Sequence, residues 1–301
     1  MLAGAIAFAL VRTGAIGGSG SDNTANPSTG TPAVILVTNP PTGSPSPSPT
    51  ASPRPGPPIT SPVDVPIMMY HIIGPPDQPA NDALAVSTDD FKAQMSYLAC
   101  AGYTPITMQR LFDVFDGKAS LPDKPIILTF DDGWAGQYTY GFPVLQQHGF
   151  AGSFAIVTGF VDAGGPYATW AQIADMSGAG MEMMSHTVSH IDLGSADDAT
   201  DIDQLQTSKA ALQAHIGHTV DYFVYPSGEP FRSGTAERQA QVVQMLKNAG
   251  YRGALLDNNG YGAEDPAHPY ELNRVRVSGG EGIYAYAGSI YGVSPDTLNC
   301  R

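Results

Sequence analysis

Two adjacent carboxylates stand at the end of a strongly apolar segment. The run LTFDDGW ends its apolar part at Phe130 and continues with Asp131, Asp132 and the turn residue Gly133. Adjacent like charges oppose each other's ionisation unless a cation or a division of roles separates them. A metal bound by one carboxylate would leave the other to take a proton from water. Taken alone, the motif is explained equally well by an Asp-Asp-Gly turn at the surface.

A second apolar segment leads into two histidines. The run MSHTVSH spaces His186 and His190 four residues apart, and on one helical turn this spacing places both imidazoles on the same side. Imidazoles are ligands for zinc and its divalent neighbours, although such a pair also occurs as plain solvent-facing residues. With Asp132 they make three protein ligands, which leaves a fourth position on a catalytic zinc for water. The chain's two cysteines lie far from both motifs, so a structural site closed by thiolates is disfavoured.

Apolar runs that favour strands alternate with segments of helical spacing. Strands are expected at Val65–Tyr70, Lys124–Phe130, Gly152–Val157, Met181–Ser185, Tyr222–Tyr225, Gly253–Leu256 and Asn273–Val277. Helices are expected over Thr88–Gly102, with Ser87 or Thr88 as N-cap, and over Tyr140–His148, near Trp170, Asp201–Ile216 and Ala236–Ala249. This alternation predicts parallel strands joined by crossover helices, in a barrel or an open sheet. Functional residues are then expected at the carboxyl ends of the strands.

Three motifs, TFDDG, HTVSH and YFVYPSG, resemble in order and separation the polysaccharide deacetylases of carbohydrate esterase family 4, also called the NodB-homology domain. The resemblance covers residues 63–301 and implies an α/β fold, a distorted (β/α) barrel of about seven parallel strands forming a single catalytic domain. It implies that Asp131 is the catalytic base. It also implies one divalent metal, Zn²⁺ ahead of Co²⁺, Ni²⁺ or Mn²⁺, bound by Asp132, His186 and His190.

The third motif departs from the family pattern. Tyr225, Pro226 and Ser227 match the segment whose backbone lines the oxyanion pocket in the family. The family usually has an arginine before this segment and a tyrosine after its proline, and Val224 and Ser227 occupy those places here. This segment therefore lacks the arginine that usually tethers the catalytic base in the family, while the backbone N–H of Ser227 remains available to an oxyanion.

The histidine that acts as general acid in most of the family is also missing from its usual place. Most of the family has a C-terminal Leu-x-His motif, where this chain has LNRVRV. The run VPIMMYHII resembles instead the circularly permuted branch typified by poly-N-acetylglucosamine deacetylases, in which the strand bearing the acid histidine comes first. This resemblance makes His71 the candidate acid. The alternative is a histidine that merely caps the first strand.

Two further strand-end residues have open roles. Arg274, in NRVRV, is a candidate to replace the missing tether by pairing with Asp131, or else it is solvated at the surface. Asp257, in LLDNNG, is expected either to orient a histidine or to form an Asx turn.

Composition limits the partners and the compartment. The formal net charge is −14, with no basic run, so nucleic acid is not expected and an uncharged or cationic sugar polymer suits the surface better. Residues 1–16 are apolar and are interpreted as the remnant of a signal peptide or membrane anchor, and residues 17–62 as a disordered linker rich in Pro, Ser, Thr and Gly. We therefore expect an exported protein, extracellular or in the cell envelope. Cys100 and Cys300 either form a disulfide there or remain separate thiols.

The function that these features favour is metal-dependent removal of N-acetyl groups from a polymer containing N-acetylglucosamine, which yields acetate and free amine. An O-acetyl esterase acting on xylan-like polymers would share the same site. A non-catalytic carbohydrate-binding barrel is the other alternative, and loss of Asp131 or of a metal ligand would mark it. All four of those residues are present. The subsite aromatics, such as Trp134 and Trp170, are too few to identify the polymer.

Overall fold

A computed structural model describes residues 57–77, 79–258, 260, 263–290 and 300. Segment 1–16 and most of the expected linker, 17–62, lie outside these residues. Near the end of that linker the Ile59 N–H donates to the Phe115 carbonyl at 3.0 Å, so contact with the folded domain begins upstream of Val63. Within the described part of the chain, no helix has the length and apolarity needed to span a membrane.

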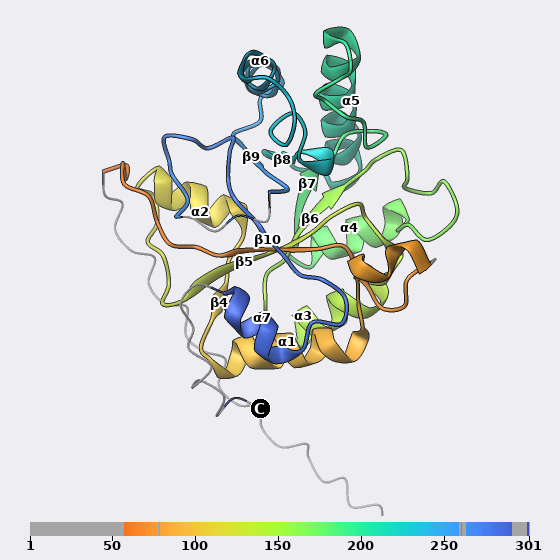
Figure 1. Cartoon of the computed structure of the whole chain (residues 1–301), viewed down its shortest axis with the longest axis vertical. Coiled ribbons are helices and arrows are strands. Elements are labelled where there is room, and N and C mark those ends of the chain that lie inside the picture. Colours follow the sequence, from red (N-terminus) through yellow and green to blue (C-terminus); the bar gives the residue numbers. More distant parts are fainter. Residues whose placement is uncertain (1–56, 78, 259, 261–262, 291–299, 301) are drawn as a thin grey trace, which may run out of the picture. The chain divides into compact units, whose positions relative to one another are not determined.

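Seven parallel strands form the centre of the molecule, one in each segment expected to be a strand. They are β1 (Ile67–Tyr70), β5 (Pro125–Phe130), β6 (Ser153–Ile156), β7 (Glu182–Ser185), β8 (Tyr222–Val224), β9 (Gly253–Leu255) and β10 (Val275–Arg276). Their order in the sheet is β10-β1-β5-β6-β7-β8-β9. A bridge between Leu255 and Leu272 links β9 to the segment just before β10, so the sheet curls round toward closure (Figure 1). The expected distorted barrel is confirmed.

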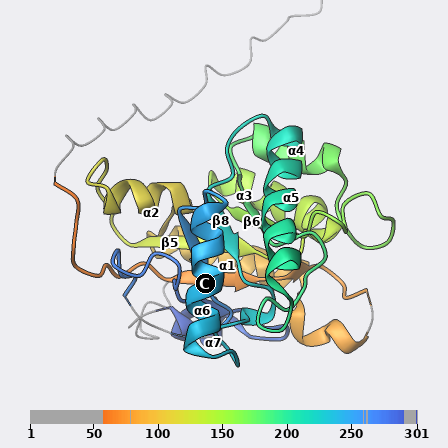
Figure 2. The same cartoon turned by 90° about the horizontal axis from the view of Figure 1, so that it is seen from above.

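Helices surround the curled sheet (Figures 1 and 2). They are α1 (Thr88–Cys100), α2 (Met108–Phe115), α3 (Phe142–His148), α4 (Trp170–Gly178), α5 (Asp198–Ile216), α6 (Ala236–Asn248) and α7 (Ile283–Ser289). Shorter elements are the 3-10 turns η1 (Pro79–Leu84) and η3 (Pro226–Gly228), the π-helical turn η2 (Gln137–Gly141), and the strands β2 (Ile72–Ile73), β3 (Ala85–Val86) and β4 (Thr104–Pro105). The expected cap of α1 is Ser87, whose hydroxyl accepts the Asp90 N–H at 3.1 Å.

Helix α2 was not anticipated from the sequence. It is short, but Thr107 caps it, and Met108, Leu111 and Phe112 recur at helical spacing and are buried. Its first two N–H groups, which have no partner inside the helix, donate to the carboxylate of Glu182 on β7 at 2.8 Å each. This cap comes from a residue more than seventy positions away, so local sequence could not reveal it.

The strands are buried on both faces, which explains their nearly continuous apolar sequences. In β5, Ile126, Leu128 and Phe130 belong to the core beneath the outer helices, and Ile127 belongs to the core inside the curl, where it joins α2. Thr129 shares the inner face with Ile127 and is fully buried. The barrel interior therefore changes from apolar to polar toward the carboxyl ends of the strands.

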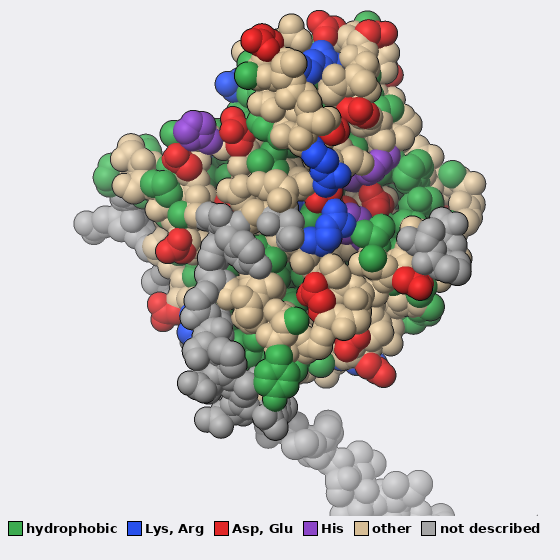
Figure 3. Space-filling view, viewed as in Figure 1, with side chains coloured by type: hydrophobic (Ala, Val, Ile, Leu, Met, Phe, Trp, Pro, Cys, Tyr) green, Lys and Arg blue, Asp and Glu red, His purple; other side chains and the backbone are tan. Residues whose placement is uncertain are grey.

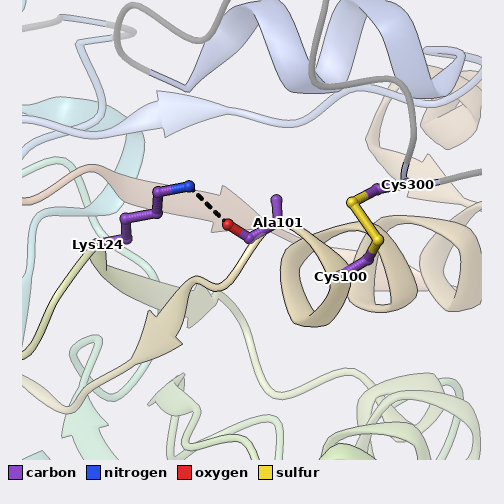
Figure 4. Close-up of a disulfide and its surroundings, with 4 residues drawn as sticks. All are labelled: Cys100, Ala101, Lys124 and Cys300. Atoms are coloured by element: carbon purple, nitrogen blue, oxygen red, sulfur yellow. Dashed lines mark hydrogen bonds between the residues drawn. A yellow bond between two sulfur atoms is a disulfide. The ribbon is translucent and has the colours of Figure 1, made fainter.

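A disulfide joins Cys100, the last residue of α1, to Cys300, and the Cα atoms lie 5.4 Å apart (Figure 4). This separation is within the usual range for disulfides. Of the two possibilities that the sequence left open, the structure contains the bridge. Beside it, Lys124 Nζ donates to the carbonyl of Ala101 at 2.7 Å, which ties the end of α1 to the start of β5.

Candidate metal centre and catalytic pocket

His71 and Asp131 leave the sheet from neighbouring strands. β1 pairs with β5 so that Tyr70 lies opposite Phe130, and the next residue of each strand is therefore a site residue. His71 Nε2 lies 4.0 Å from Asp131 Oδ2, and both side chains are buried. The side-chain amide of Gln137 donates to the carbonyls of His71 and Asp131, at 2.8 and 2.6 Å. Gln137 thus fastens the two strand ends together, and no sequence pattern indicated this role.

Asp132, His186 and His190 converge on one point. Asp132 Oδ1 lies 3.5 Å from Nε2 of each histidine, and one ligand atom from each of the three residues falls within 4.8 Å of the others. His186 Nδ1 lies 2.8 Å from the carbonyl oxygen of Val224. A carbonyl can only accept a hydrogen bond, so Nδ1 carries a proton and Nε2 is the nitrogen that faces Asp132, in the position of a metal ligand. This set of two nitrogens and one oxygen fits a divalent transition metal.

The two histidines do not lie on a helical turn, and that part of the prediction was wrong. They flank a tight turn after β7, in which Thr187 and His190 adopt left-handed backbone with φ of 66° and 57°. The Thr187 hydroxyl accepts the His190 N–H at 2.9 Å, and Gln204 Oε1 from α5 accepts the two N–H groups in between at 3.0 Å each. Side-chain hydrogen bonds, rather than helix geometry, therefore bring the imidazoles together.

Trp134 positions the carboxylate of Asp132. Its indole Nε1 donates to Asp132 Oδ2 at 2.9 Å, which leaves Oδ1 facing the imidazoles. The indole is in turn packed against Tyr167, at 4.7 Å between ring centroids. Burial would raise the pKa of Asp132, but the imidazoles, His186 first, outweigh it and hold the pKa below its usual range. The sequence had suggested only a subsite role for this tryptophan.

Arg274 is fully buried and binds Asp131 with both arms of its guanidinium. Nη1 donates to Oδ1 at 2.7 Å and Nη2 to Oδ2 at 2.8 Å, while Nε donates to the Leu256 carbonyl at 2.6 Å. The pairing that the sequence left open is therefore present, and solvation at the surface is not. Burial would raise the pKa of Asp131, but the Arg274 guanidinium holds it below its usual range, so the group is a carboxylate at neutral pH.

The third motif borders the same pocket at the end of β8. Tyr225 is fully buried, Pro226 is buried behind it, and Ser227 is exposed with a left-handed φ of 53°. Within the described part of the chain, the Ser227 N–H makes no backbone or side-chain hydrogen bond. It therefore remains available to a ligand.

Asp257 contacts arginines, not a histidine. Its carboxylate accepts Arg276 Nη2 at 2.7 and 2.8 Å, and Arg232 Nη2 lies 3.3 Å from Oδ2. Of the two roles that the sequence left open for Asp257, the orientation of a histidine is not found, because these guanidiniums occupy its oxygens. His71 Nδ1 is correspondingly buried without a hydrogen-bond partner in the described part of the chain. Arg232 and Arg276 were not anticipated as site residues.

One pocket of about 230 Å³ collects most of the predicted residues. It is lined by His71, Leu84, Asp131, Asp132, His186, His190, Tyr225, Ser227, Arg232, Asp257 and Arg276. Arg274, which binds Asp131, is not among the lining residues, and neither is Pro226. A buried carboxylate, a set of three candidate metal ligands and an imidazole therefore converge at the carboxyl ends of parallel strands, where the functional groups of such folds gather.

Comparison with known proteins indicates the family of this chain. Residues 118–254 match the family described as Polysaccharide deacetylase. The chain is 25% identical over 233 residues to the Bacillus subtilis protein YxkH, which is assigned to the polysaccharide deacetylases, with 77% of this chain and 76% of that protein covered. A crystal structure of a protein from Bacillus anthracis with the same assignment has 30% identity and a TM-score of 0.63, covering 75% of this chain and 68% of that one.

A third relative is the poly-β-1,6-N-acetyl-D-glucosamine N-deacetylase of Escherichia coli, which is 29% identical over 119 residues. That match spans 35% of this chain and 18% of the relative. Together these likenesses show that the chain belongs to the polysaccharide deacetylase family, whose members are hydrolases. The family resemblance carried by the three sequence motifs is confirmed.

Replacing Trp134 by Phe should weaken metal binding by about 10- to 100-fold, because Asp132 Oδ2 loses the donor that orients it. Metal affinity is measured by competition with a chromogenic chelator. Trp170→Phe is the control, since Trp170 stacks on His215 and is not among the residues lining the catalytic pocket. Equal affinity in the Trp134 variant and the wild type would show that the indole does not position the ligand.

Replacing Arg274 by Gln should shift the acidic limb of the pH profile of kcat/KM toward higher pH. Without the guanidinium, burial dominates and raises the pKa of Asp131, so the carboxylate forms only at higher pH. Breaking a buried pair also costs about 3–5 kcal/mol of stability, so activity is normalised to the folded fraction. Arg274→Lys keeps the charge and should shift the limb less. If the acidic limb of the profile does not move in Arg274→Gln, then Arg274 does not control the pKa of Asp131.

Proposed function

We propose that the protein removes N-acetyl groups from a polymer containing N-acetylglucosamine, with one divalent metal. The observation that carries the proposal is the opposed placement of two carboxylates on adjacent residues. Asp131 is held by Arg274, while Asp132 faces two imidazoles. One carboxylate is therefore kept as a base and its neighbour is arranged as a ligand.

The residues that would hold the metal are Asp132, His186 and His190. Zn²⁺ is favoured because a mixed imidazole and carboxylate set suits it, with Co²⁺, Ni²⁺ and Mn²⁺ as alternatives. When bound, such an ion polarises a carbonyl and makes water more acidic. Three protein ligands rather than four are what a catalytic site requires.

Asp131 is suited to take the proton from the attacking water. The Arg274 ion pair keeps it ionised and fixes its orientation, and it is buried in the pocket wall, where few solvent molecules compete. The Ser227 N–H borders the same pocket and is suited to donate to the oxygen that gains negative charge. In this way a backbone donor takes the oxyanion role although the surrounding motif has lost its usual side chains.

His71 is suited to protonate the departing amine. It lines the same pocket as the three candidate metal ligands, and its Nε2 lies 4.0 Å from Asp131 Oδ2. Burial lowers the pKa of His71 against the opposing effect of Asp131, which makes its imidazolium a stronger acid. An amide needs such an acid more than an ester does, because an amine leaves poorly without a proton. The presence of His71 therefore suits the release of an amine, and acetate release from N-acetylated and O-acetylated polymers decides between N-deacetylation and the esterase alternative.

We also propose that the protein is exported to the cell envelope or beyond it. The Cys100–Cys300 disulfide supports this proposal, since disulfides persist in oxidising compartments. Anchoring through residues 1–16 remains part of the proposal, and those residues lie outside the described chain.

The proposed reaction is tested by acetate release from chitooligosaccharides, poly-N-acetylglucosamine, peptidoglycan and acetylated xylan. We expect turnover of at least one N-acetylated polymer after loading with Zn²⁺, and its loss after chelation. Asp131→Asn should abolish turnover with metal content nearly intact, whereas Asp132→Asn should reduce both. Release from xylan alone would favour the esterase, and equal metal loss in both variants would show that the two roles are wrongly divided.

His71→Ala should lower kcat for an N-acetylated substrate by about 10²–10⁴ without reducing metal content. Hydrolysis of an aryl acetate should survive the substitution far better, because its leaving group departs without a proton. The comparison of the two substrates in the same variant separates acid catalysis from damage to the fold. If both substrates lose activity equally, His71 is a structural residue that caps β1.

A further inference from the structure

A second cavity, of about 380 Å³, adjoins the catalytic pocket. The two share Arg232, Asp257 and Arg276, so one cluster of charged side chains forms the wall between them. Phe231 and Leu256 also line the second cavity. Its volume is within the roughly 300–1,000 Å³ of small-molecule sites. A polymer whose acetyl group enters the catalytic pocket would therefore have a neighbouring residue within reach of this cavity.

The shared wall contains two guanidiniums and one carboxylate. The Asp257 carboxylate accepts Arg276 Nη2, and Arg232 uses its own Nη2 toward Asp257, at 3.1 Å from the carbonyl and 3.3 Å from Oδ2. The Arg232 side chain is 53% exposed, and its Nε and Nη1 make no hydrogen bond within the described part of the chain. These donors are therefore available to a ligand in the cavity.

This local charge has the opposite sign to that of the whole protein. The chain carries −14, from which a neutral or cationic polymer was expected. Lys and Arg side chains nonetheless gather beside histidines at the centre of the face shown in Figure 3, with acidic side chains among them and spread around them. At physiological salt, charges more than about 8 Å from a bound group are largely screened. The residues lining the site, rather than the net charge, therefore decide which groups it accepts.

We propose that the second cavity is a subsite for a carboxylate-bearing sugar that neighbours the acetylated residue in the polymer. Arg232 contacts the carboxylate, and Phe231, which packs on Tyr225, offers an apolar surface to the sugar ring. A guanidinium fork matches a carboxylate in shape and charge. The single surplus positive charge of the lining matches one carboxylate better than a doubly charged phosphate. The inference rests on the proposed deacetylation, and it makes the natural substrate an acidic heteropolymer.

The first test compares two matched substrates. One is an oligosaccharide in which N-acetylglucosamine alternates with glucuronic acid, and the other is the same oligosaccharide with its carboxyls reduced to alcohols. We expect the wild type to favour the acidic form in kcat/KM by about tenfold or more, which is the range of a hydrogen bond to a charged group. Arg232→Gln should bring the ratio of the two values close to one. The wild-type preference should also shrink as NaCl is raised.

Arg252→Gln is the matched control. Arg252 also bridges to an aspartate, with Nη2 2.8 Å from Asp116, but it precedes β9 and so lies at the opposite end of the barrel. This variant should keep the wild-type preference. Equal kcat/KM for the acidic and reduced substrates in the wild type would overturn the proposal, as would a preference that survives in Arg232→Gln.

The second test does not depend on turnover. A short oligomer of glucuronic acid has no acetyl group, so its affinity for the metal-loaded protein is measured by calorimetry even if no polymer is deacetylated. It should bind about tenfold more tightly than its carboxyl-reduced form, and Arg232→Gln should remove the difference. Equal affinity for the two forms would refute the subsite while leaving the deacetylase proposal intact. A sugar phosphate that binds the wild type more tightly than the glucuronate would refute the assignment to a carboxylate.

Discussion

The buried ion pair between Arg274 and Asp131 is the interaction on which the rest of the site depends. Removing two charges from water costs several kcal/mol for each ion, and close pairing with satisfied hydrogen bonds is needed to offset it. Arg274 meets this condition by donating also to Thr129 and to the Leu256 carbonyl. The pair therefore connects β5, the end of β9 and β10 across the inside of the curled sheet, where apolar side chains fill the layers below.

This constraint gives two neighbouring aspartates opposite environments. Asp131 points back toward a guanidinium, whereas Asp132, with a φ of 74°, turns the chain so that its carboxylate meets an indole and two imidazoles. Left-handed backbone is unfavourable for most side chains, but aspartate tolerates it better than most, and Gly133 continues it at a φ of 81° without cost from a Cβ. A local distortion at a strand end thus separates two carboxylates that would otherwise repel each other.

A second arginine–aspartate cluster, formed by Arg232, Arg276 and Asp257, lines the same pocket and differs from the first in exposure. Arg274 has no access to water, so its charge serves to hold the Asp131 carboxylate. The Arg232 side chain is about half exposed, so its charge remains accessible to a ligand. The same pair of residue types is therefore suited to hold a carboxylate in one place and to meet a ligand in the other, and the difference arises from depth in the barrel.

The amino-acid sequence by itself determined the seven strands, most of the helices and the motif residues that meet in the candidate pocket. These features depend on local patterns, namely continuous apolar runs, helical spacing and the short motifs around Asp131 and His186, which are read without knowing the fold.

Three matters were decided only by tertiary structure. Arg274 reaches Asp131 because β10 lies beside β1 in the sheet. Asp257 does not contact a histidine because arginines from other segments bind its carboxylate. The histidine pair was found from its spacing but for the wrong geometric reason, because a turn held by Gln204 replaces the expected helix. In each case the hydrogen-bonding or ion-pair partner lies too far along the chain for a local sequence pattern to specify it. The packing of the barrel determines which side chain makes the contact.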